Sequence, residues 1–326
     1  MQSRQRRLLL ALLALALAAL VAAGCGGDDE GSAGGGGSTT EEQASDQPGA
    51  GKPALTIGTK DFTEEFVLGE LYAQALRAKG YRVNLKRNIG PTEITDKALT
   101  SKRIDAYPEY TGITVAVVAE KDVLTPSKEE TAKLAKEFYE GRGQAVIGPT
   151  PFQDVDAIAT TKEFAQKNGL STVADLKKVS SFRLGARPEF KSRFTGLVGM
   201  RKEYGITNAK FRQLALGLQY QALDKGDVDA ANVFSTDAQL ASGKYTVLQD
   251  PKGIFGFQQV NFVINQDTYD ALGGTQFAGV IESVNKLLTN DAMQSMNAAV
   301  DLDKKDPKAV AAQFLQANDL AGGSSS

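Results

Sequence analysis

The chain has 326 residues, 42% of them apolar and 23% charged, with 37 basic against 39 acidic side chains, as expected for a globular protein with a sizeable core. It contains no His and no Trp, which excludes Ser-His-Asp and Cys-His catalysis and every His-ligated metal site. A single Cys cannot close an intramolecular disulfide, and a formal charge of -2 offers no basic field for nucleic acid.

The N-terminal segment has the pattern of an export signal. Arg4, Arg6 and Arg7 precede an unbroken apolar run over residues 8–23, which ends in small residues. This run is shorter than the roughly 20 residues that a membrane-spanning helix needs. We therefore predict a signal peptide over residues 1–24, with a retained anchor helix as the alternative.

The single cysteine, Cys25, stands directly after the apolar run. Residues 20–25, LVAAGC, resemble a bacterial lipobox, although Ala22 stands where that pattern more often has Leu. The resemblance implies that Cys25 is lipidated and holds the protein at the outer face of the bacterial cell membrane; an incidental thiol is the alternative. Residues 26–52 have no large apolar side chain, so we predict a flexible tether over residues 25–53.

The folded part begins at residue 54 with alternating strands and helices. Residues 55–58 predict a strand, and Asp61 with Glu64 predicts a capping box at the start of a helix that ends near Gly80. Residues 81–85 predict the next strand, Gly90-Pro91 a second helix, and residues 104–106 a third strand. This order indicates a parallel sheet with crossover helices.

The same pattern restarts after the proline-containing residues 149–151, which indicates a second lobe. Strands are predicted at residues 155–160, 182–185, 228–234, 247–248 and 260–264, and short helices at residues 162–167 and 173–178. The remainder to residue 318 reads as helical, with Asp306-Pro307 starting the last helix.

The two halves share an internal echo. Residues 98–99, 104–106 and 110–111 match residues 222–223, 228–230 and 234–235 with identical offsets. In each half a helix and a strand lead to an aromatic residue followed by a hydroxyl, just past the strand end where open α/β sheets bind ligands. The echo predicts two rings that face each other across a cleft; chance similarity of helix-strand units is the alternative.

Two motifs resemble those of the osmoprotectant-binding proteins of ABC importers, the receptors for glycine betaine, choline and carnitine. They are IGTKDFTEE at residues 57–65 and IDAYPEYTG at residues 104–112, with weaker matches at residues 189–193, 221–223 and 234–237. The resemblance implies an α/β, two-lobed, periplasmic-binding-protein-like fold (type II) with a hinge between the lobes. Lobe 1 would comprise residues 54–154 plus 259–326, and lobe 2 residues 155–258.

In that family a box of aromatic rings holds a quaternary ammonium, and basic residues hold the carboxylate of the ligand. The resemblance implies ligand contacts from eight residues: Lys60, Tyr110, Thr111, Asp154, Asp156, Arg193, Phe234 and Phe257. Lys60 and Arg193 match the carboxylate-holding pair. Phe234 and Phe257 replace tyrosines, and Asp156 stands at a ring position. We therefore expect an altered cage in which Asp156 favours an ammonium that carries hydrogens.

Five of these residues also have a simpler interpretation: Lys60 and Arg193 as surface charges, Phe234 and Phe257 as core, Asp156 as a cap or an ion-pair partner. Of Tyr107 and Tyr110, an extended backbone would turn only one toward the ligand, and we favour Tyr110.

The sequence thus predicts an exported, lipid-tethered solute receptor. It would bind a betaine, choline or a related amine and deliver it to an ABC permease, without catalysis, cofactor, metal or nucleic acid. The alternatives are a receptor for an amino acid, polyamine or other amine on the same fold, a surface-anchored enzyme, and a sensor or germination-type receptor domain.

Overall fold

A computed structural model describes residues 47–322, so the predicted signal peptide, Cys25 and the tether as far as residue 46 lie outside the described residues. The last residues of the predicted tether form a turn against the folded part. There the N–H of Gly49 donates to the carbonyl of Lys79, 2.9 Å away, just after helix α2 (Thr63–Ala78). Among residues 47–322, the helices are all too short or too polar to cross a membrane.

The first lobe is built on a five-stranded sheet with the order β2-β1-β3-β10-β4. Its strands are β1 (Leu55–Gly58), β2 (Val83–Lys86), β3 (Ala106–Tyr110), β4 (Gln144–Ile147) and β10 (Val260–Asn265). Strand β1 is parallel to β2 and β3, but β10 is antiparallel to both β3 and β4. The three strands for which the sequence predicted parallel pairing, β1, β2 and β3, are parallel as expected, and the returning strand β10 makes the sheet mixed. Strand β10 returns from the second lobe, so no crossover helix fixes its direction.

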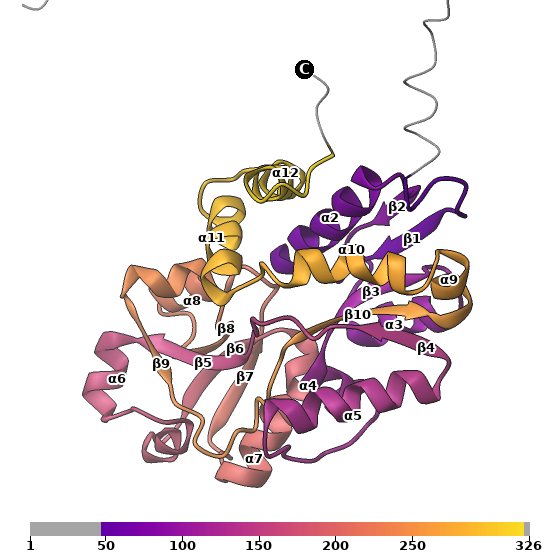
Figure 1. Cartoon of the computed structure of the whole chain (residues 1–326). Helices are drawn as coiled ribbons and strands as arrows, with labels where there is room; N and C mark the ends of the chain where they lie inside the picture. Colours follow the sequence, from indigo (N-terminus) through magenta and orange to yellow (C-terminus); the bar gives the residue numbers. More distant parts are fainter. Residues whose placement is uncertain (1–46, 323–326) are drawn as a thin grey trace, which may run out of the picture. The chain divides into compact units, whose positions relative to one another are not determined.

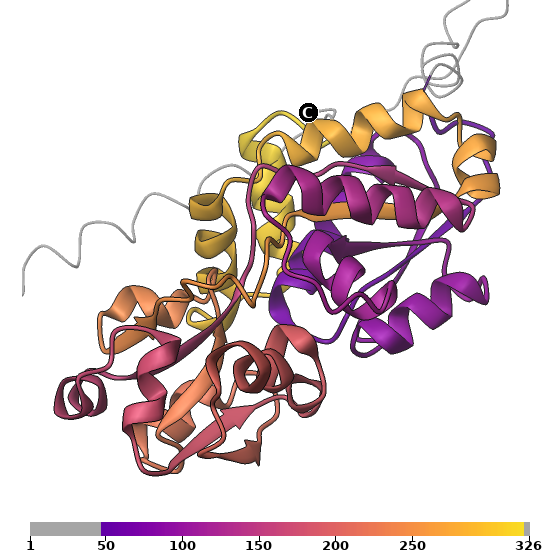
Figure 2. The same cartoon turned by 90° about the horizontal axis from the view of Figure 1, so that it is seen from below.

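Helices cover both faces of this sheet (Figures 1 and 2). On one face α2 packs against α10 (Thr275–Asn285), α11 (Asn290–Asp301) and α12 (Pro307–Ala317). The other face carries α3 (Thr92–Thr100) and α5 (Lys128–Gly141), which share a small core with the fully buried Tyr107. Shorter elements complete the lobe: α4 (Thr111–Ile113), the π-helical turn η1 (Thr114–Val118) and α9 (Gln266–Ala271).

The second lobe repeats this architecture with the order β7-β6-β8-β5-β9. Its strands are β5 (Asp156–Thr161), β6 (Phe182–Ala186), β7 (Ala209–Gln213), β8 (Ala230–Phe234) and β9 (Tyr245–Leu248). Strand β6 is parallel to β7 and β8, while β5 is antiparallel to β8 and β9. The helical elements are α6 (Lys162–Asn168), η2 (Val173–Lys178), η3 (Pro188–Lys191), η4 (Phe194–Val198), α7 (Gly199–Tyr204), α8 (Gln219–Asp224) and η5 (Ala238–Ser242).

Several local predictions are confirmed and others are wrong. The strand at residues 55–58 and the last helix, capped by the Asp306 carboxylate, are as predicted. The capping box at α2 is wrong, because Phe62 is the N-cap and Glu64 turns into the interior. The third strand begins at Ala106 rather than at residue 104 and runs to Tyr110. Helix α5 and strands β4 and β7 were not predicted.

Two segments connect the lobes, residues 148–155 and residues 249–259. They pair with each other through an antiparallel bridge between Gln153 and Gln259. The N–H of Asp154 donates to the carbonyl of Gln258 at 3.0 Å. These paired segments form the hinge, and two of their side chains, Asp154 and Gln258, line the cavity described below.

Candidate functional site

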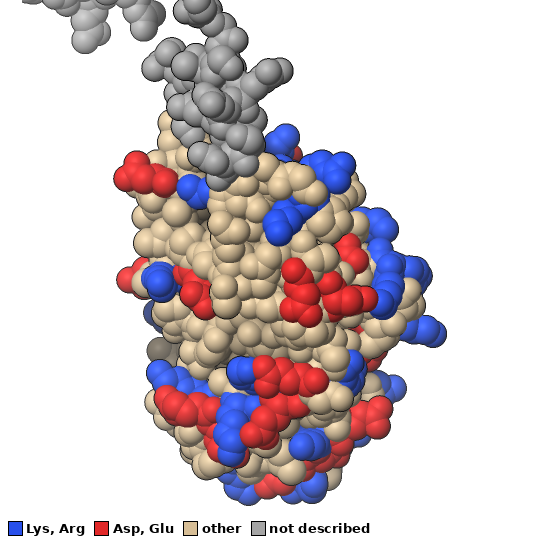
Figure 3. Space-filling model, turned by 45° about the vertical axis from the view of Figure 1, so that its right-hand side comes forward, with Lys and Arg blue, Asp and Glu red and all other residues tan. Residues whose placement is uncertain are grey.

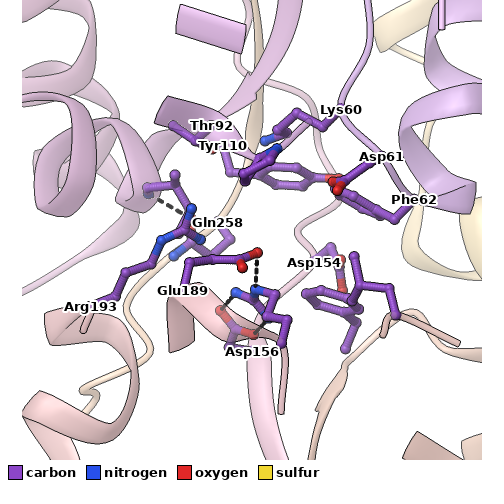
Figure 4. A pocket seen from close by; sticks show the side chains of 15 residues that line it. Lys60, Asp61, Phe62, Thr92, Tyr110, Asp154, Asp156, Glu189, Arg193 and Gln258 are labelled. Atoms are coloured by element: carbon purple, nitrogen blue, oxygen red, sulfur yellow. Dashed lines mark hydrogen bonds and ion pairs between the residues drawn. The ribbon is translucent and has the colours of Figure 1, made fainter. Parts of the chain in front are cut away.

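A cavity of about 450 Å³ lies where the two sheets present the ends of their strands. Its lining follows the carboxyl ends of β1, β3, β6 and β8, which is where open α/β sheets generally bind ligands. The lining residues are Lys60, Asp61, Phe62, Pro91, Thr92, Tyr110, Ile113, Asp154, Asp156, Arg187, Glu189, Arg193, Leu216, Phe234 and Gln258. Figure 4 shows Lys60, Phe62 and Tyr110 on one side of the cavity and Asp156 and Glu189 on the other.

Three aromatic rings from the two lobes adjoin one another in this cavity. The ring of Phe62 lies 5.4 Å from that of Phe234, with 16° between the planes, and 6.1 Å from that of Tyr110. Tyr107 lies in the core instead, where its hydroxyl meets that of Tyr139 at 2.8 Å. The structure thus brings Tyr110 and Phe234, the two rings of the echo, to the same cavity.

The ammonium of Lys60 is held by acids of its own lobe. Its Nζ donates to Glu109 Oε1 at 2.5 Å and lies 3.6 Å from Glu65 Oε1. It also lies 4.3 Å from the centre of the Tyr110 ring, in a cation–π arrangement. Burial and the neighbouring Glu109 raise the pKa of Glu65 to about 8, against the opposing effect of Lys60. In this arrangement Lys60 neutralises a buried carboxylate rather than pointing freely into the cavity.

The carboxylate of Asp156 is also paired with residues of its own lobe. Arg187 donates to both of its oxygens, at 2.7 and 2.8 Å, and Asn232 Nδ2 donates at 2.8 Å. The Arg187 guanidinium also lies 5.1 Å from the centre of the Phe234 ring. The expectation that Asp156 selects the hydrogens of a ligand ammonium is therefore not supported. Its carboxylate already has three donors, and it fixes Arg187 over the ring.

Arg193 reaches across to the first lobe. Its Nε and Nη2 donate to the carboxylate of Glu93 on α3, at 3.2 and 2.8 Å. Burial alone would raise the pKa of Glu93, but hydrogen bonding and the charge of Arg193 lower it. All three basic residues that line the cavity, Lys60, Arg187 and Arg193, therefore have acid partners.

Two predicted site residues do not line the cavity. The Thr111 hydroxyl donates to the carbonyl of Phe257 at 3.0 Å, so the two residues join β3 to the hinge. This junction is close: a Cβ on the next residue, Gly112, would lie 2.7 Å from the Phe257 carbonyl oxygen. Thr111 and Phe257 therefore contact each other's segments and not the cavity.

Asp154 differs from the other acids of the cavity. Its Oδ1 accepts from the Thr236 N–H at 3.2 Å and from the Ser235 hydroxyl at 3.3 Å, whereas its Oδ2 accepts from no residue in the range 47–322. Only 5% of the residue is exposed. Burial, then the nearby charges of Glu64 and Asp237, raise the pKa of Asp154 well above its usual range. A cation in the cavity would stabilise this carboxylate.

Glu64 accepts hydrogen bonds from residues of both lobes. Its carboxylate accepts from the Tyr110 hydroxyl at 2.7 Å, the Thr236 hydroxyl at 2.6 Å and Asn297 Nδ2 at 3.0 Å. Burial raises its pKa, while these three donors lower it. Because Thr236 belongs to the second lobe and Tyr110 to the first, Glu64 links the positions of both.

Sequence reasoning missed Phe62 and Arg187. Phe62 lies inside the first family-like motif, so only its orientation was unknown. Arg187 could have been found by extending the echo. The N–H of Thr56 donates to Asp105, and that of Arg183 to Asp229, each at 2.7 Å. Lys60 and Arg187 each stand four residues after these equivalent donors.

On the face in Figure 3 acidic and basic side chains lie side by side rather than in one basic area. Within residues 47–322 no cluster of acids or Cys is arranged to hold a metal ion.

Comparisons with known proteins agree on the family. Residues 53–317 match the model of the substrate-binding domain of ABC-type glycine betaine transport systems. A glycine-betaine-binding protein of Pseudomonas aeruginosa is 31% identical over 82% of this chain and 88% of its own length. An ergothioneine transport permease/ergothioneine binding protein of Helicobacter pylori is 29% identical over 80% of this chain and 47% of its own length.

Solved structures share the fold. One of a glycine betaine/carnitine/choline ABC transporter superposes with a TM-score of 0.66 at 24% identity, over 82% of this chain and 99% of the other. The predicted two-lobed, hinged α/β fold is therefore confirmed. The family consists of transport binding proteins, not enzymes. The chain belongs to the substrate-binding domains of ABC-type glycine betaine transport systems, extracytoplasmic proteins that capture a solute for an ABC permease.

Proposed function

We propose that the cavity binds a small solute with a quaternary ammonium group against Phe62, Tyr110 and Phe234. A quaternary ammonium has no N–H to donate, so a protein holds it with ring faces, each contributing about 0.5 to 2 kcal/mol. The observation that supports the proposal is the convergence of these three rings at one cavity. The names of the relatives, which include glycine-betaine-binding protein, agree with this ligand class.

The rings come from both lobes, which suits a receptor that closes on its ligand. Phe62 belongs to the first lobe and Phe234 to the second, and the Arg193–Glu93 pair also joins the lobes. A ligand that contacts both lobes stabilises the closed form relative to the open one. The closed form is then available for recognition by the permease.

Isothermal titration of the full chain with glycine betaine, carnitine and choline tests the proposal. We expect at least one of the three to bind, and Phe234→Leu to weaken that binding about two- to thirtyfold, the contribution of one ring face. Phe211→Leu is a matched control, because Phe211 is half-buried on β7 and does not line the cavity. No binding of any of the three, or equal effects of the two substitutions, would contradict the proposal.

We also propose that Cys25 carries a lipid anchor. The support is its position directly after the apolar run, in a lipobox-like segment. In a bacterial host the protein should incorporate a labelled fatty acid and sediment with membranes. The variant Cys25→Ser should lose the label, and persistence of the label in this variant would rule the anchor out.

A further inference from the structure

A second cavity of about 890 Å³ adjoins the ring-lined one. The two share Asp61, Phe62, Asp154, Leu216 and Phe234 as a common wall. A molecule held against the rings could therefore extend past Asp154 into the second cavity without leaving the protein.

The lining of the second cavity is acidic. It includes Asp61, Glu64, Asp154, Asp237 and Asp301, and none of these has an ion-pair partner within residues 47–322. Lys304, the one base among the described lining residues, donates to the backbone carbonyl of Asp301 at 2.7 Å rather than to a carboxylate. This contrasts with the ring-lined cavity, where each base is neutralised by an acid.

One acid of this lining keeps a free acceptor although it is almost completely buried. Asp154 is 5% exposed, and its Oδ2 accepts from no residue in the range 47–322, since the Thr236 N–H and the Ser235 hydroxyl both donate to Oδ1. A buried carboxylate oxygen without a donor is costly, so this wall between the two cavities favours a group that supplies N–H bonds.

We propose that the second cavity is a subsite for an N–H-bearing cationic group on the same ligand whose quaternary ammonium lies against the rings. A quaternary ammonium cannot donate to the free Oδ2 of Asp154, whereas a protonated amine or guanidinium donates to it and neutralises the neighbouring acids. Burial and the charges of neighbouring acids raise the pKa of Asp154, and burial raises the pKa of Asp237 to about 6, which a bound cation would reverse. The inference rests on the proposed function and adds to its ligand class molecules that carry an N–H-bearing cation beyond the quaternary ammonium.

Two probes of nearly equal length test the subsite by titration of the full chain. Aminopropyl-trimethylammonium carries a protonated amine at its far end, and butyl-trimethylammonium carries a methyl group there. We expect the amine-ended probe to bind about tenfold or more tightly, because a charge-assisted hydrogen bond to a buried carboxylate favours it. Equal affinities of the two probes would overturn the subsite. Failure of both probes to bind would also overturn the subsite, and it would overturn the proposed function only if glycine betaine, carnitine and choline fail to bind as well.

Variants test whether the preference for the amine-ended probe arises in the second cavity. Asp154→Asn and Asp301→Asn should each reduce the affinity ratio of the two probes, and the double variant should bring it close to one. Asp303→Asn is the matched control. Asp303 lies two residues after Asp301, the last residue of α11, pairs with Lys305 and does not line the cavity. Each ratio compares two compounds on one variant, so partial unfolding lowers both affinities and leaves the ratio intact. A ratio that survives the double variant would overturn the assignment to this cavity.

Discussion

At the scale of single residues, Arg193 can pair either with the carboxylate of Glu93 or with the carboxylate of a bound ligand. In the structure its guanidinium fork is occupied by Glu93, whose side chain is 47% exposed. A zwitterionic ligand would compete with Glu93 for the same donors, whereas choline would not. Replacing Glu93 by Gln should therefore raise the affinity for glycine betaine relative to choline by up to about fivefold, the scale of one partly exposed ion pair.

Titration of both ligands into the Glu93→Gln variant checks this expectation. Glu137→Gln, an exposed acid on α5 outside the cavity, serves as the control. If the ratio of the two affinities stays at its wild-type value in Glu93→Gln, Arg193 does not exchange Glu93 for a ligand carboxylate.

The family-like motifs at residues 57–65, 104–112 and 189–193 led to the expectation that Lys60, Tyr110 and Arg193 share one site, and all three line the same cavity. The motifs could not supply the partners of these residues. Glu109 stands 49 residues from Lys60 along the chain, and Asp156 stands 31 residues from Arg187. Such pairs depend on which strands become neighbours and in what register. A motif gives the side chains that a strand end presents, but not the charges that neutralise them.

At the scale of elements, β3 and β8 are equivalent central strands, and each is preceded by an Asp that holds the neighbouring strand. Asp229 accepts from the Arg183 N–H at 2.7 Å and from Arg183 Nε and Nη2 at 2.9 and 2.6 Å. Asp229→Ala leaves the β6 N–H without this partner and should lower the free energy of unfolding by about 1 to 3 kcal/mol. Urea denaturation followed by circular dichroism measures the change.

Asp227→Ala is the control for this element, because Asp227 is exposed in the same turn. An equal effect of the two substitutions would show that the hydrogen bond between Asp229 and the Arg183 N–H on β6 does not stabilise the protein. The echo in the sequence predicted both central strands because an Asp, a buried strand and a terminal ring recur at fixed offsets. The strands β10 and β5 were predicted as well, but the echo could not show that they run antiparallel to β3 and β8, because the chain enters each of them from the other lobe.

At the scale of the whole molecule, the buried acids around the cavity make stability depend on pH. Burial raises the folded-state pKa of Glu65 to about 8, above its ordinary 4.5, and raises that of Glu64 and Asp154 as well. Between the unfolded and folded pKa values the native state holds a proton that the unfolded chain has released. In this range the free energy of unfolding therefore falls as pH rises. Groups with lowered pKa, such as Glu93 and Asp229, act in the opposite sense and only in more acid solution.

We therefore expect the protein to be more stable at about pH 5.5 than at about pH 8, with a slope of up to about 1.4 kcal/mol per pH unit for each such group. Glu65→Gln mimics the protonated acid. It should flatten this slope by making the protein more stable at the upper end, where the wild-type carboxylate is forced to ionise beside Glu109. Urea titrations of both proteins across the range measure the slopes. Parallel slopes would mean that Glu65 keeps its charge throughout, so that Lys60 neutralises Glu65 and Glu109 together and is not available to a ligand carboxylate.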